Sequence, residues 1–465
     1  MSRLLIVSNR LPVTVKHDGG RVSVAQSSGG LATGLKGPHE RSGGLWIGWP
    51  GDVSRLSPNQ RQELEGSLAA LRAAPIHLTP GEVSRYYEGY ANGVLWPLFH
   101  YLIDRIPLAN TDWEAYRKVN ERFAEIVQSH YQDGDMIWVH DYQLLLLPRM
   151  LRERLPRARI GFFLHIPFPA PEVFRTLPNR GVLLNGLLGA DLIGLHTPAY
   201  VQHFAGALSQ VLGIPSGGDR VEIEGREVRL RAFPMGVDAA AFAELAASPE
   251  VLEEVQRIRA SLRGQRLLLG IDRLDYTKGI PRRLLAVERL LEREPSLRGK
   301  LRFVQISVPS RDKVAAYQQF RSEVEQLAGR INGAHGTVES APIHYLYRSF
   351  SMKQLTALYM AADVMLVTPL RDGMNLVAKE FAASRTDEDG VLVLSELAGA
   401  ATELSDAMLV NPYDIDETAS AIRQALAMPR EERRDRMRAM RRRVFEFNVH
   451  RWASAYLDAL AGGGS

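Results

Sequence analysis

The sequence predicts an α/β protein with two doubly wound domains that face each other across a cleft. Three observations carry this prediction. Short apolar runs recur along the whole chain and are separated by helix-length segments, an alternation typical of largely parallel sheets covered on both faces. The number of such runs exceeds the number of strands that a single sheet usually contains. A break in this alternation falls near residues 235–265.

The expected strands lie on both sides of the break. They are Leu4–Val7, Met136–Val139, Ile160–Leu164, Leu192–Leu195, Val228–Phe233, Leu267–Ile271, Phe303–Ile306, Val364–Val367 and Val391–Leu394. The run Val228–Phe233 ends in Pro234–Asp238, and a polar helical stretch follows it. Because Arg266–Gly270 then opens a fresh series of strands, we expect the second domain to begin between these points.

Length and composition indicate an ordinary globular chain. With 465 residues, of which 45% are hydrophobic and 24% charged, two or three domains can each bury a core. The absence of cysteine excludes disulfides and thiolate metal sites. Met1–Arg3 run directly into Leu4–Val7, which is too short for the apolar core of a signal peptide, and no stretch approaches the length of a membrane span. We therefore expect a cytoplasmic protein without a membrane partner.

The stretch from Arg430 to Arg443 is rich in arginine, although the net charge of the chain is only +4. Such a run is one signature of nucleic-acid binding. Glu431, Glu432 and Asp435 are interspersed in it, however. The sequence therefore favours a solvated helix and no nucleic-acid partner.

Two acidic segments are not expected to carry chemistry. Asp414-Ile415-Asp416 resembles a metal-binding Asp-x-Asp motif, but it precedes the helical stretch Glu417–Leu426 and is placed to cap that helix. Asp387–Gly390 comes before the strand Val391–Leu394 rather than after it, so we expect it to be a loop.

Chemically capable residues follow nearly every expected strand. The segments are Ser8–Arg10, His140–Tyr142, His165–Pro169, Asp272–Gly279, Ser307–Arg311 and Thr368–Asn375. In open α/β sheets, ligands bind beyond the carboxyl ends of the strands. These segments together predict a large polar cleft for an anionic ligand rich in hydroxyl groups.

Arg273 and Lys278 lie five residues apart in a loop that leads through Gly279 into a helix. Two cations converging there suit a diphosphate, because charge-assisted bonds to phosphate oxygens are strong. Salt bridges to Asp272 or Asp275 would use the same residues. Spacing alone does not choose between these two interpretations.

The segment Asp372–Glu380 adds weight to the phosphate interpretation. Gly373 permits an unusual backbone turn, and Asn375 is placed to cap a helix that begins at Leu376. The free N–H groups and positive dipole end of such a helix suit a phosphate. Glu380, one turn further on, is placed to accept hydrogen bonds from ribose hydroxyls.

These motifs, in one order and spacing, resemble those of the trehalose-6-phosphate synthases, glycosyltransferase family 20. The residues that carry the resemblance are Ser8–Arg10, Ser28–Leu31, Tyr86-Tyr87, Leu95–Pro97, His140–Tyr142, Phe162–Pro169, Arg273–Gly279 and Thr368–Glu380. It extends from residue 3 to about residue 450. Asp372 and Glu380 also resemble the acidic pair of retaining GT-B glycosyltransferases.

The resemblance implies a GT-B architecture of two Rossmann-like domains. The first, an acceptor domain for glucose 6-phosphate, would span residues 1–237 and be completed by a final helix at about 447–465 that crosses back to it. The second, over residues 238–446, would bind the nucleotide sugar.

The resemblance also assigns roles to residues of the donor site. Arg273 and Lys278 are expected to hold the diphosphate, and His165 and Asp372 to orient the transferred glucose. The other implied donor contacts are the phosphate loop Gly29 and Gly30, Phe350 near the uracil, Gly373, Met374 and Asn375, the backbone of Leu376 and Val377, and Glu380 at the ribose.

The implied acceptor site binds glucose 6-phosphate. Arg10, Tyr87 and Arg311 are expected to grip its phosphate, Asp141 its hydroxyls, and Trp96 to shape the pocket. The resemblance implies no metal or other cofactor, and His140 and His165 have no close third ligand in the sequence.

Cleavage of the anomeric bond develops positive charge on the sugar and negative charge on the diphosphate, which Arg273, Lys278 and the helix end at Leu376 would stabilise. No side chain stands out as a nucleophile. We therefore expect same-face substitution, in which the leaving phosphate oxygen helps to deprotonate the acceptor; Asp141 as a base is the competing idea.

Three functions remain at this point. The first is transfer of glucose from a nucleotide-glucose to glucose 6-phosphate in trehalose biosynthesis, with UDP favoured over ADP or GDP. The second is a related synthase of the glucosylglycerol-phosphate or validoxylamine-phosphate type. The third is a non-catalytic sensor of glucose 6-phosphate. The family further implies a homo-oligomer, a dimer or tetramer, and a separate phosphatase acting on the product.

Overall fold

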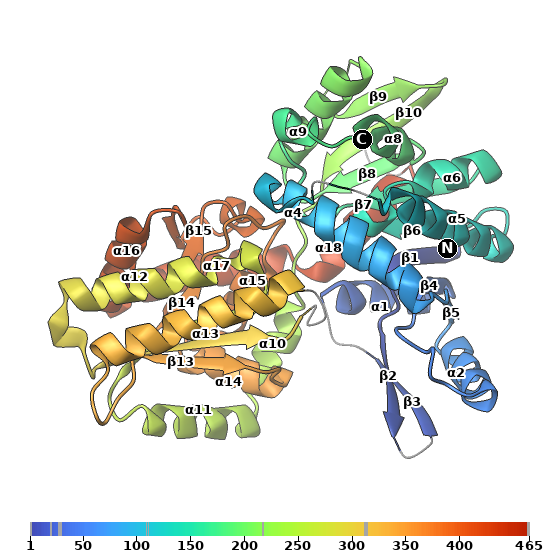
Figure 1. Cartoon of the computed structure of the whole chain (residues 1–465). Coiled ribbons are helices and arrows are strands. Elements are labelled where there is room, and N and C mark those ends of the chain that lie inside the picture. Colours follow the sequence, from blue (N-terminus) through green and yellow to red (C-terminus); the bar gives the residue numbers. More distant parts are fainter. Residues whose placement is uncertain are drawn as a thin grey trace. The chain divides into compact units, whose positions relative to one another are not determined.

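The computed structural model (Figure 1) describes residues 2–18, 21–26, 30–107, 109, 111–215, 218–310 and 315–462. The chain divides into two compact units. Unit 1 comprises Met1–Pro234 together with Val449–Ser465, and unit 2 comprises Met235–Asn448. Unit 2 thus begins a few residues before the expected boundary at 237.

Unit 1 contains an eight-stranded sheet in the order β5-β4-β1-β6-β7-β8-β10-β9. Its strands are β1 (Leu4–Arg10), β4 (Leu45–Trp49), β5 (Ala73–Pro75), β6 (Met136–His140), β7 (Arg159–Phe163), β8 (Leu192–Leu195), β9 (Arg220–Ile223) and β10 (Arg226–Ala232). Every neighbouring pair is parallel except β9 and β10. The prediction of a largely parallel sheet is therefore confirmed. A separate hairpin pairs β2 (Val13–Asp18) with β3 (Arg21–Gln26).

Helices connect the strands of unit 1. They are α1 (Gly30–Ser42), α2 (Pro58–Ala70), α3 (Pro80–Glu82), the π-helix η1 (Val83–Leu95), α4 (Trp96–Phe99), η2 (Ile103–Arg105), α5 (Trp113–His130), η3 (Tyr142–Leu144), α6 (Leu147–Arg154), α7 (Pro171–Phe174), α8 (Arg180–Leu187), α9 (Pro198–Ala207), η4 (Leu208–Leu212) and α18 (Val449–Leu460).

Helix α18 belongs to unit 1, although it follows unit 2 in the sequence. The Tyr456 ring stacks on Trp138 with centroids 4.2 Å apart, and the Tyr456 hydroxyl donates to the carbonyl oxygens of Phe162 and Leu192. The helix can approach this closely because Gly194 lacks a side chain: a Cβ there would lie 2.6 Å from Tyr456. A large aromatic ring thus seals the sheet over β6, β7 and β8.

Unit 2 contains a six-stranded parallel sheet in the order β13-β12-β11-β14-β15-β16. Its strands are β11 (Arg266–Arg273), β12 (Leu301–Val308), β13 (Ile343–Tyr347), β14 (Val364–Val367), β15 (Val391–Ser395) and β16 (Met408–Val410). All residues of β14 and β15 are buried. Because successive side chains point to opposite faces, both faces of the sheet are covered, as expected.

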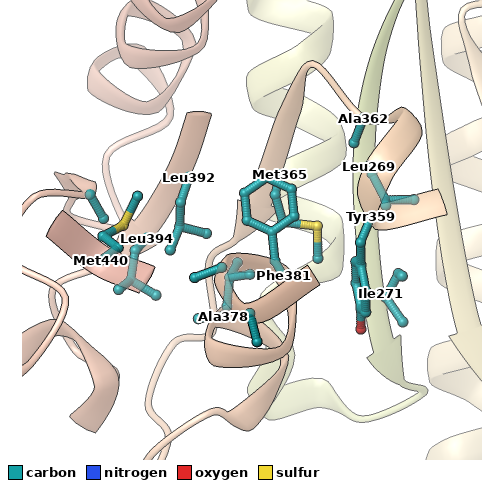
Figure 2. Close-up of a cluster of buried hydrophobic side chains, with 14 of the residues drawn as sticks. Leu269, Ile271, Tyr359, Ala362, Met365, Ala378, Phe381, Leu392, Leu394 and Met440 are labelled. Carbon is teal, nitrogen blue, oxygen red and sulfur yellow. The ribbon is translucent and has the colours of Figure 1, made fainter. Parts of the chain in front are cut away.

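The helices of unit 2 fall into two packed groups. One contains α10 (Ala239–Ala246), α11 (Pro249–Ser261), α14 (Met352–Ala361), α15 (Leu376–Ser384) and α17 (Arg430–Glu446), and the other α12 (Ile280–Arg293), α13 (Ala315–His335) and α16 (Ile415–Ala427). Short turns are η5 (Tyr276–Lys278), η6 (Pro295–Leu297) and η7 (Gly399–Thr402). Figure 2 shows the core under the first group, where Phe381 of α15 lies beside Met365 of β14 and near Leu392 of β15.

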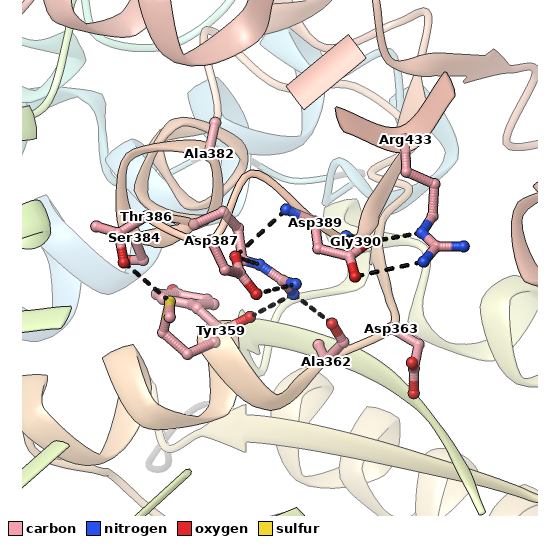
Figure 3. A network of polar contacts seen from close by, with 12 residues as sticks. Tyr359, Ala362, Asp363, Ala382, Ser384, Thr386, Asp387, Asp389, Gly390 and Arg433 are labelled. Carbon is pink, nitrogen blue, oxygen red and sulfur yellow. Dashed lines mark hydrogen bonds and ion pairs between the residues drawn. The ribbon is translucent and has the colours of Figure 1, made fainter. Parts of the chain in front are cut away.

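A buried arginine fixes the end of α15. The Arg385 guanidinium donates to the carbonyl oxygens of Tyr359 and Ala362 and pairs with Asp387 at 2.8 Å. Beside it, Arg433 of α17 pairs with Asp389, as Figure 3 shows. The segment 387–390 is a loop, as the sequence predicted, and its two aspartates also hold Arg385 and Arg433, which the sequence did not predict.

Two further predictions about charged segments are tested here. Asp414 caps α16 by accepting from the Glu417 backbone N–H at 2.8 Å, so its capping role is confirmed. The arginine-rich stretch does form a helix, α17, but Arg441 is partly buried and donates to the carbonyl oxygens of Ala382 and Ala383. This helix is therefore docked on α15 and not only solvated.

Among the residues that the structure describes, none of the helices combines the length and the apolar character needed to span a lipid bilayer.

Candidate active site

Both sheets reverse their strand order at one point. In unit 2 the strand order is β13-β12-β11-β14-β15-β16. From β11, the first strand of the unit, the chain adds β12 and β13 on one side and then β14, β15 and β16 on the other side. The order therefore reverses between β11 and β14. Unit 1 has the same order from β5 to β8 and reverses between β1 and β6. The carboxyl ends of strands at such a switch point are where doubly wound sheets bind ligands. The predicted residues Arg10, Asp141 and Arg273 lie at or next to these strand ends.

Trp49 brings two predicted phosphate-binding residues of unit 1 together. The Arg10 guanidinium carbon lies 5.0 Å from the centroid of the Trp49 ring, and the Tyr87 ring lies 6.4 Å from the same ring. Arg10 is exposed at the end of β1, so its charge is available to an anion. Arg311, the third expected residue, lies outside the described residues, as does Gly29.

A π-helix presents Tyr87. The wide turns of η1 hold a buried amide, Asn92, whose Nδ2 donates to the Tyr87 carbonyl oxygen at 2.7 Å. The Tyr142 hydroxyl donates to Asn92 Oδ1, also at 2.7 Å. Trp96 follows η1 directly, is buried, and lies with its ring 5.6 Å from that of Tyr142. Asn92 thus joins the segments that carry Tyr87, Trp96 and Asp141; π-helical turns often occur at functional sites.

Asp141 has a strained backbone. Its φ is 76° and its ψ is 169°, a region that is essentially reserved for glycine. Its N–H donates to the Phe163 carbonyl oxygen at 2.8 Å, and its Oδ1 accepts from the His165 N–H at 3.2 Å. The surrounding hydrogen bonds hold this conformation, and such strain is common at functional sites.

His165 lies just beyond β7 and contacts another histidine. Its Nε2 is 3.1 Å from Nδ1 of His140, the last residue of β6. Burial lowers the pKa of His140 to about 3, and burial together with His140 and His196 lowers the pKa of His165 well below its usual range. Both rings are therefore neutral at physiological pH.

In unit 2, Lys278 pairs with neither Asp272 nor Asp275. Its Nζ lies 2.6 Å from Oδ2 of Asp372, in the loop after β14. Asp275 instead caps the η5 turn at Thr277. The partner of Lys278 therefore comes from the loop after the neighbouring strand, β14, across the switch point.

Arg283, which the sequence did not single out, holds the Lys278 turn in place. Its fully buried guanidinium donates to Asp272 at 2.5 Å, to Thr368 Oγ1 at 2.9 Å and to the Lys278 carbonyl oxygen at 3.2 Å. It thereby ties β11, the end of β14 and η5 together. Gly279, with a φ of 67°, completes the turn into α12.

The loop after β14 leads into α15. Asn375 caps this helix through Oδ1, which accepts from the Ala378 N–H at 3.4 Å, and its Nδ2 donates to Asp372 Oδ2 at 3.0 Å. The unusual backbone expected at Gly373 lies instead at Asn375, where φ is 72°. An asparagine tolerates this conformation and caps as well, which explains the shift. Met374 is buried behind the loop.

Helix α15 begins at Leu376, directly after the loop that follows β14, and its first two residues, Leu376 and Val377, are half-buried. Further along, Glu380 Oε2 accepts from the buried Tyr359 hydroxyl at 2.8 Å. Burial raises the pKa of Glu380, and the Tyr359 hydrogen bond lowers it, with burial the larger effect. Phe350 follows β13 and lies under the Arg348 guanidinium at 4.7 Å. Gly30 is the first residue of α1.

One group of described residues has the geometry for a metal ion, and it lies outside these sites. Ligand atoms of Glu288, Glu292 and His335 lie within 4.8 Å of one another on α12 and α13. Both carboxylate oxygens of Glu288 already bind Arg330 at 2.7 Å. That guanidinium neutralises the carboxylate that an ion would need.

The folds of the two units and the residues at their switch points are those of a GT-B glycosyltransferase. A trehalose-6-phosphate synthase structure from E. coli bound with UDP-2-fluoro glucose aligns with a TM-score of 0.88 and 38% identity, covering 99% of both chains. A synthase from Burkholderia xenovorans in complex with glucose-6-phosphate aligns with a TM-score of 0.88 and 37% identity over 99% of this chain and 100% of that one.

The family follows from the sequence match. The glycosyltransferase family 20 pattern matches residues 2–462, and the chain belongs to this family. The alpha,alpha-trehalose-phosphate synthase [UDP-forming] A of Dictyostelium discoideum is 41% identical over 460 residues, which is 98% of this chain. The chain spans 62% of the length of that relative.

Proposed function

We propose that this chain transfers glucose from UDP-glucose to the 1-hydroxyl of glucose 6-phosphate, with retention, giving α,α-trehalose 6-phosphate and UDP. The observation that carries the proposal is the Lys278–Asp372 pair at the β11–β14 switch point, followed directly by the capped helix α15. A lysine, a carboxylate and free helix N–H groups are the groups needed to hold a diphosphate next to a sugar. The names of the full-length structural relatives support the same substrates.

In this reaction the bond from C1 to the diphosphate oxygen breaks, and a bond from C1 to the acceptor oxygen forms on the same face. The acceptor proton passes to the leaving phosphate oxygen. Lys278, Arg273 and the N-terminus of α15 stabilise the negative charge that develops on the diphosphate. Asp372 and His165 hold the transferred glucose.

Binding roles are divided between the units. In unit 2, Glu380 accepts from the ribose, Phe350 contacts the base, and Gly373–Val377 surround the diphosphate; Gly29 and Gly30 of unit 1 add backbone contacts to the donor phosphate. In unit 1, Arg10 and Tyr87 bind the phosphate of glucose 6-phosphate together with Arg311. Asp141 orients its hydroxyls, and Trp96 shapes the sugar pocket.

Four further features belong to the proposal. Turnover needs no metal ion, so it should persist in excess EDTA. The protein acts in the cytoplasm. It assembles as a homo-oligomer, a dimer or tetramer, which light scattering after size exclusion measures directly. A separate phosphatase consumes the phosphorylated disaccharide.

The test is a nucleotide-release assay with glucose 6-phosphate and with UDP-, ADP- or GDP-glucose offered separately. The product is identified by NMR. Release of UDP with an α,α-1,1-linked phosphorylated disaccharide supports the proposal. Release only with another acceptor would point to a related synthase. Binding of glucose 6-phosphate without turnover of any donor would point to a sensor and overturn the proposal.

A further inference from the structure

A single N–H hydrogen lies between the facing ring nitrogens of His140 and His165. The two facing nitrogens, His140 Nδ1 and His165 Nε2, are 3.1 Å apart, which is a hydrogen-bond distance. Both imidazoles are neutral, so each ring carries one hydrogen on its two nitrogens. One of the facing nitrogens must therefore donate and the other accept, and the choice fixes the tautomer of both rings.

The far side of the His140 ring decides between the two arrangements. His140 Nε2 is buried and has no hydrogen-bond partner among the described residues. If His140 carried its hydrogen there, a buried N–H would be left without an acceptor, which is the more costly kind of unsatisfied group. If the hydrogen is on Nδ1, only a lone pair is left unpaired. The second arrangement is therefore favoured, and His140 donates to His165.

The rest of His165 is already fixed. Its backbone N–H donates to Asp141 Oδ1 at 3.2 Å, and its carbonyl oxygen accepts from His196 Nε2 at 3.2 Å. Its ring packs beside Phe163 and Trp452, with centroids 4.7 and 6.1 Å away. With backbone and ring held, the position of the hydrogen is the remaining variable.

We propose that His140 is a positioning residue that holds His165 in the tautomer protonated at Nδ1, so that His165 presents a hydrogen-bond donor to a hydroxyl of the transferred glucose. The proposal rests on the function proposed above, because it uses His165 as a contact of the donor sugar. His140 itself does not touch the substrate. Its buried, partnerless Nε2 is the feature that makes the tautomer unambiguous.

The first test reads the tautomer in the wild-type protein and needs no variant enzyme to be active. Nitrogen-15 NMR of histidine-labelled protein distinguishes protonated from unprotonated ring nitrogens, and the two rings are assigned from their absence in His140→Asn and His165→Gln proteins. We expect hydrogens on Nδ1 of both His140 and His165. A hydrogen on Nε2 of His165 would overturn the proposal.

The second test separates the hydrogen bond from the ring. His140→Asn places an amide where Nδ1 lies and can still donate, whereas His140→Phe keeps the ring and donates nothing. We expect the phenylalanine variant to lose about tenfold or more in kcat, with the Kd of UDP unchanged, and the asparagine variant to recover most of that loss.

The matched control is His203→Phe, which removes a histidine of unit 1 whose Nδ1 lies 3.0 Å from the Phe168 carbonyl oxygen. It should leave kcat unchanged. Equal losses in His140→Asn and His140→Phe would show that the ring matters and not its hydrogen, and would overturn the proposal. Failure of the proposed function is distinguishable, because it appears as absent turnover in the wild-type protein while the NMR result stands alone.

Discussion

The Lys278 ammonium and the Asp372 carboxylate lie 2.6 Å apart, one in the η5 turn that follows β11 and the other in the loop after β14. Both side chains are largely buried, so their charges are only weakly screened. Asp372 also accepts from Asn375, the cap of α15. The pair therefore connects the two elements proposed to hold the diphosphate.

Removal of the lysine should mainly affect catalysis. We expect Lys278→Ala to lower kcat by about a hundredfold or more, because it removes a donor aimed at the negative charge of the leaving group. Steady-state kinetics with UDP-glucose measures this. The control is Lys300→Ala, which removes an exposed lysine outside the site and should leave kcat unchanged. A kcat near the wild-type value would show that Lys278 only neutralises the charge of Asp372.

Loss of the hydrogen bond from Tyr359 should weaken donor binding. Without that hydroxyl, burial alone acts on Glu380 and raises its pKa further, so less of the ribose-binding carboxylate is ionised. We expect Tyr359→Phe to raise the KM for UDP-glucose about three- to tenfold, with a smaller change in kcat. Tyr413→Phe, in an exposed tyrosine, is the control. An unchanged KM would remove Glu380 from the proposed ribose site.

The strain at Asp141 predicts a trade between stability and activity. Glycine adopts a φ of 76° without penalty, so Asp141→Gly should raise the free energy of unfolding by about 1–2 kcal/mol while turnover falls at least about tenfold. Urea unfolding and kinetics on the same preparation measure both. Asp141→Ala keeps the unfavourable φ and should lose activity without the gain in stability. If both variants have the same free energy of unfolding, the backbone strain at Asp141 does not lower the stability of the protein.

Because α18 packs closely on the sheet, Gly194 should not tolerate a side chain. Gly194→Ala would bring a methyl group within 2.6 Å of Tyr456 and 2.7 Å of Phe163, so we expect a loss of about 1–3 kcal/mol in unfolding free energy. The comparison is Gly329→Ala on the exposed face of α13, where nothing lies within 4 Å and the higher helix propensity of alanine should stabilise slightly. Equal stabilities in urea would contradict this account of the helix.

Acid should destabilise unit 1 through its neutral histidines. The folded-state pKa of His140 is about 3 and that of His165 is also lowered, so below about pH 6.5 the unfolded chain binds more protons than the folded one. The unfolding free energy therefore falls as pH drops, by up to about 1.4 kcal/mol per pH unit for each histidine. Urea unfolding between about pH 7 and about pH 5 measures the slope, which His140→Phe should make shallower. A variant slope as steep as that of the wild type would contradict this.

The sequence predicted most of the framework because apolar runs report burial directly. Leu192–Leu195 and Val364–Val367 are strands with the expected bounds, and Asn375 caps the expected helix. The hairpin of β2 and β3 was not among the expected strands. Short polar alternation with few apolar positions gives a weak strand signal.

Partners of the site residues could not be predicted because they come from distant parts of the chain. Trp49 lies far in sequence from Tyr87, and Arg283 looks like any other residue of an amphipathic helix. The π-helix also has no recognised periodicity signal, so Asn92 gave no sign that it supports Tyr87. Motifs named the candidate site residues, while the contacts that support those residues depended on the fold.

Helix α18 has a consequence for how the protein is made. During synthesis, the ribosome releases the whole of unit 2 before it releases Trp452 and Tyr456, which cover the sheet of unit 1. Trp138 and Phe163 therefore stay exposed to water, and to other nascent chains, for the time needed to translate more than two hundred residues. Unit 1 is thus synthesised first but completes its fold last, and chaperones can bind it during that interval.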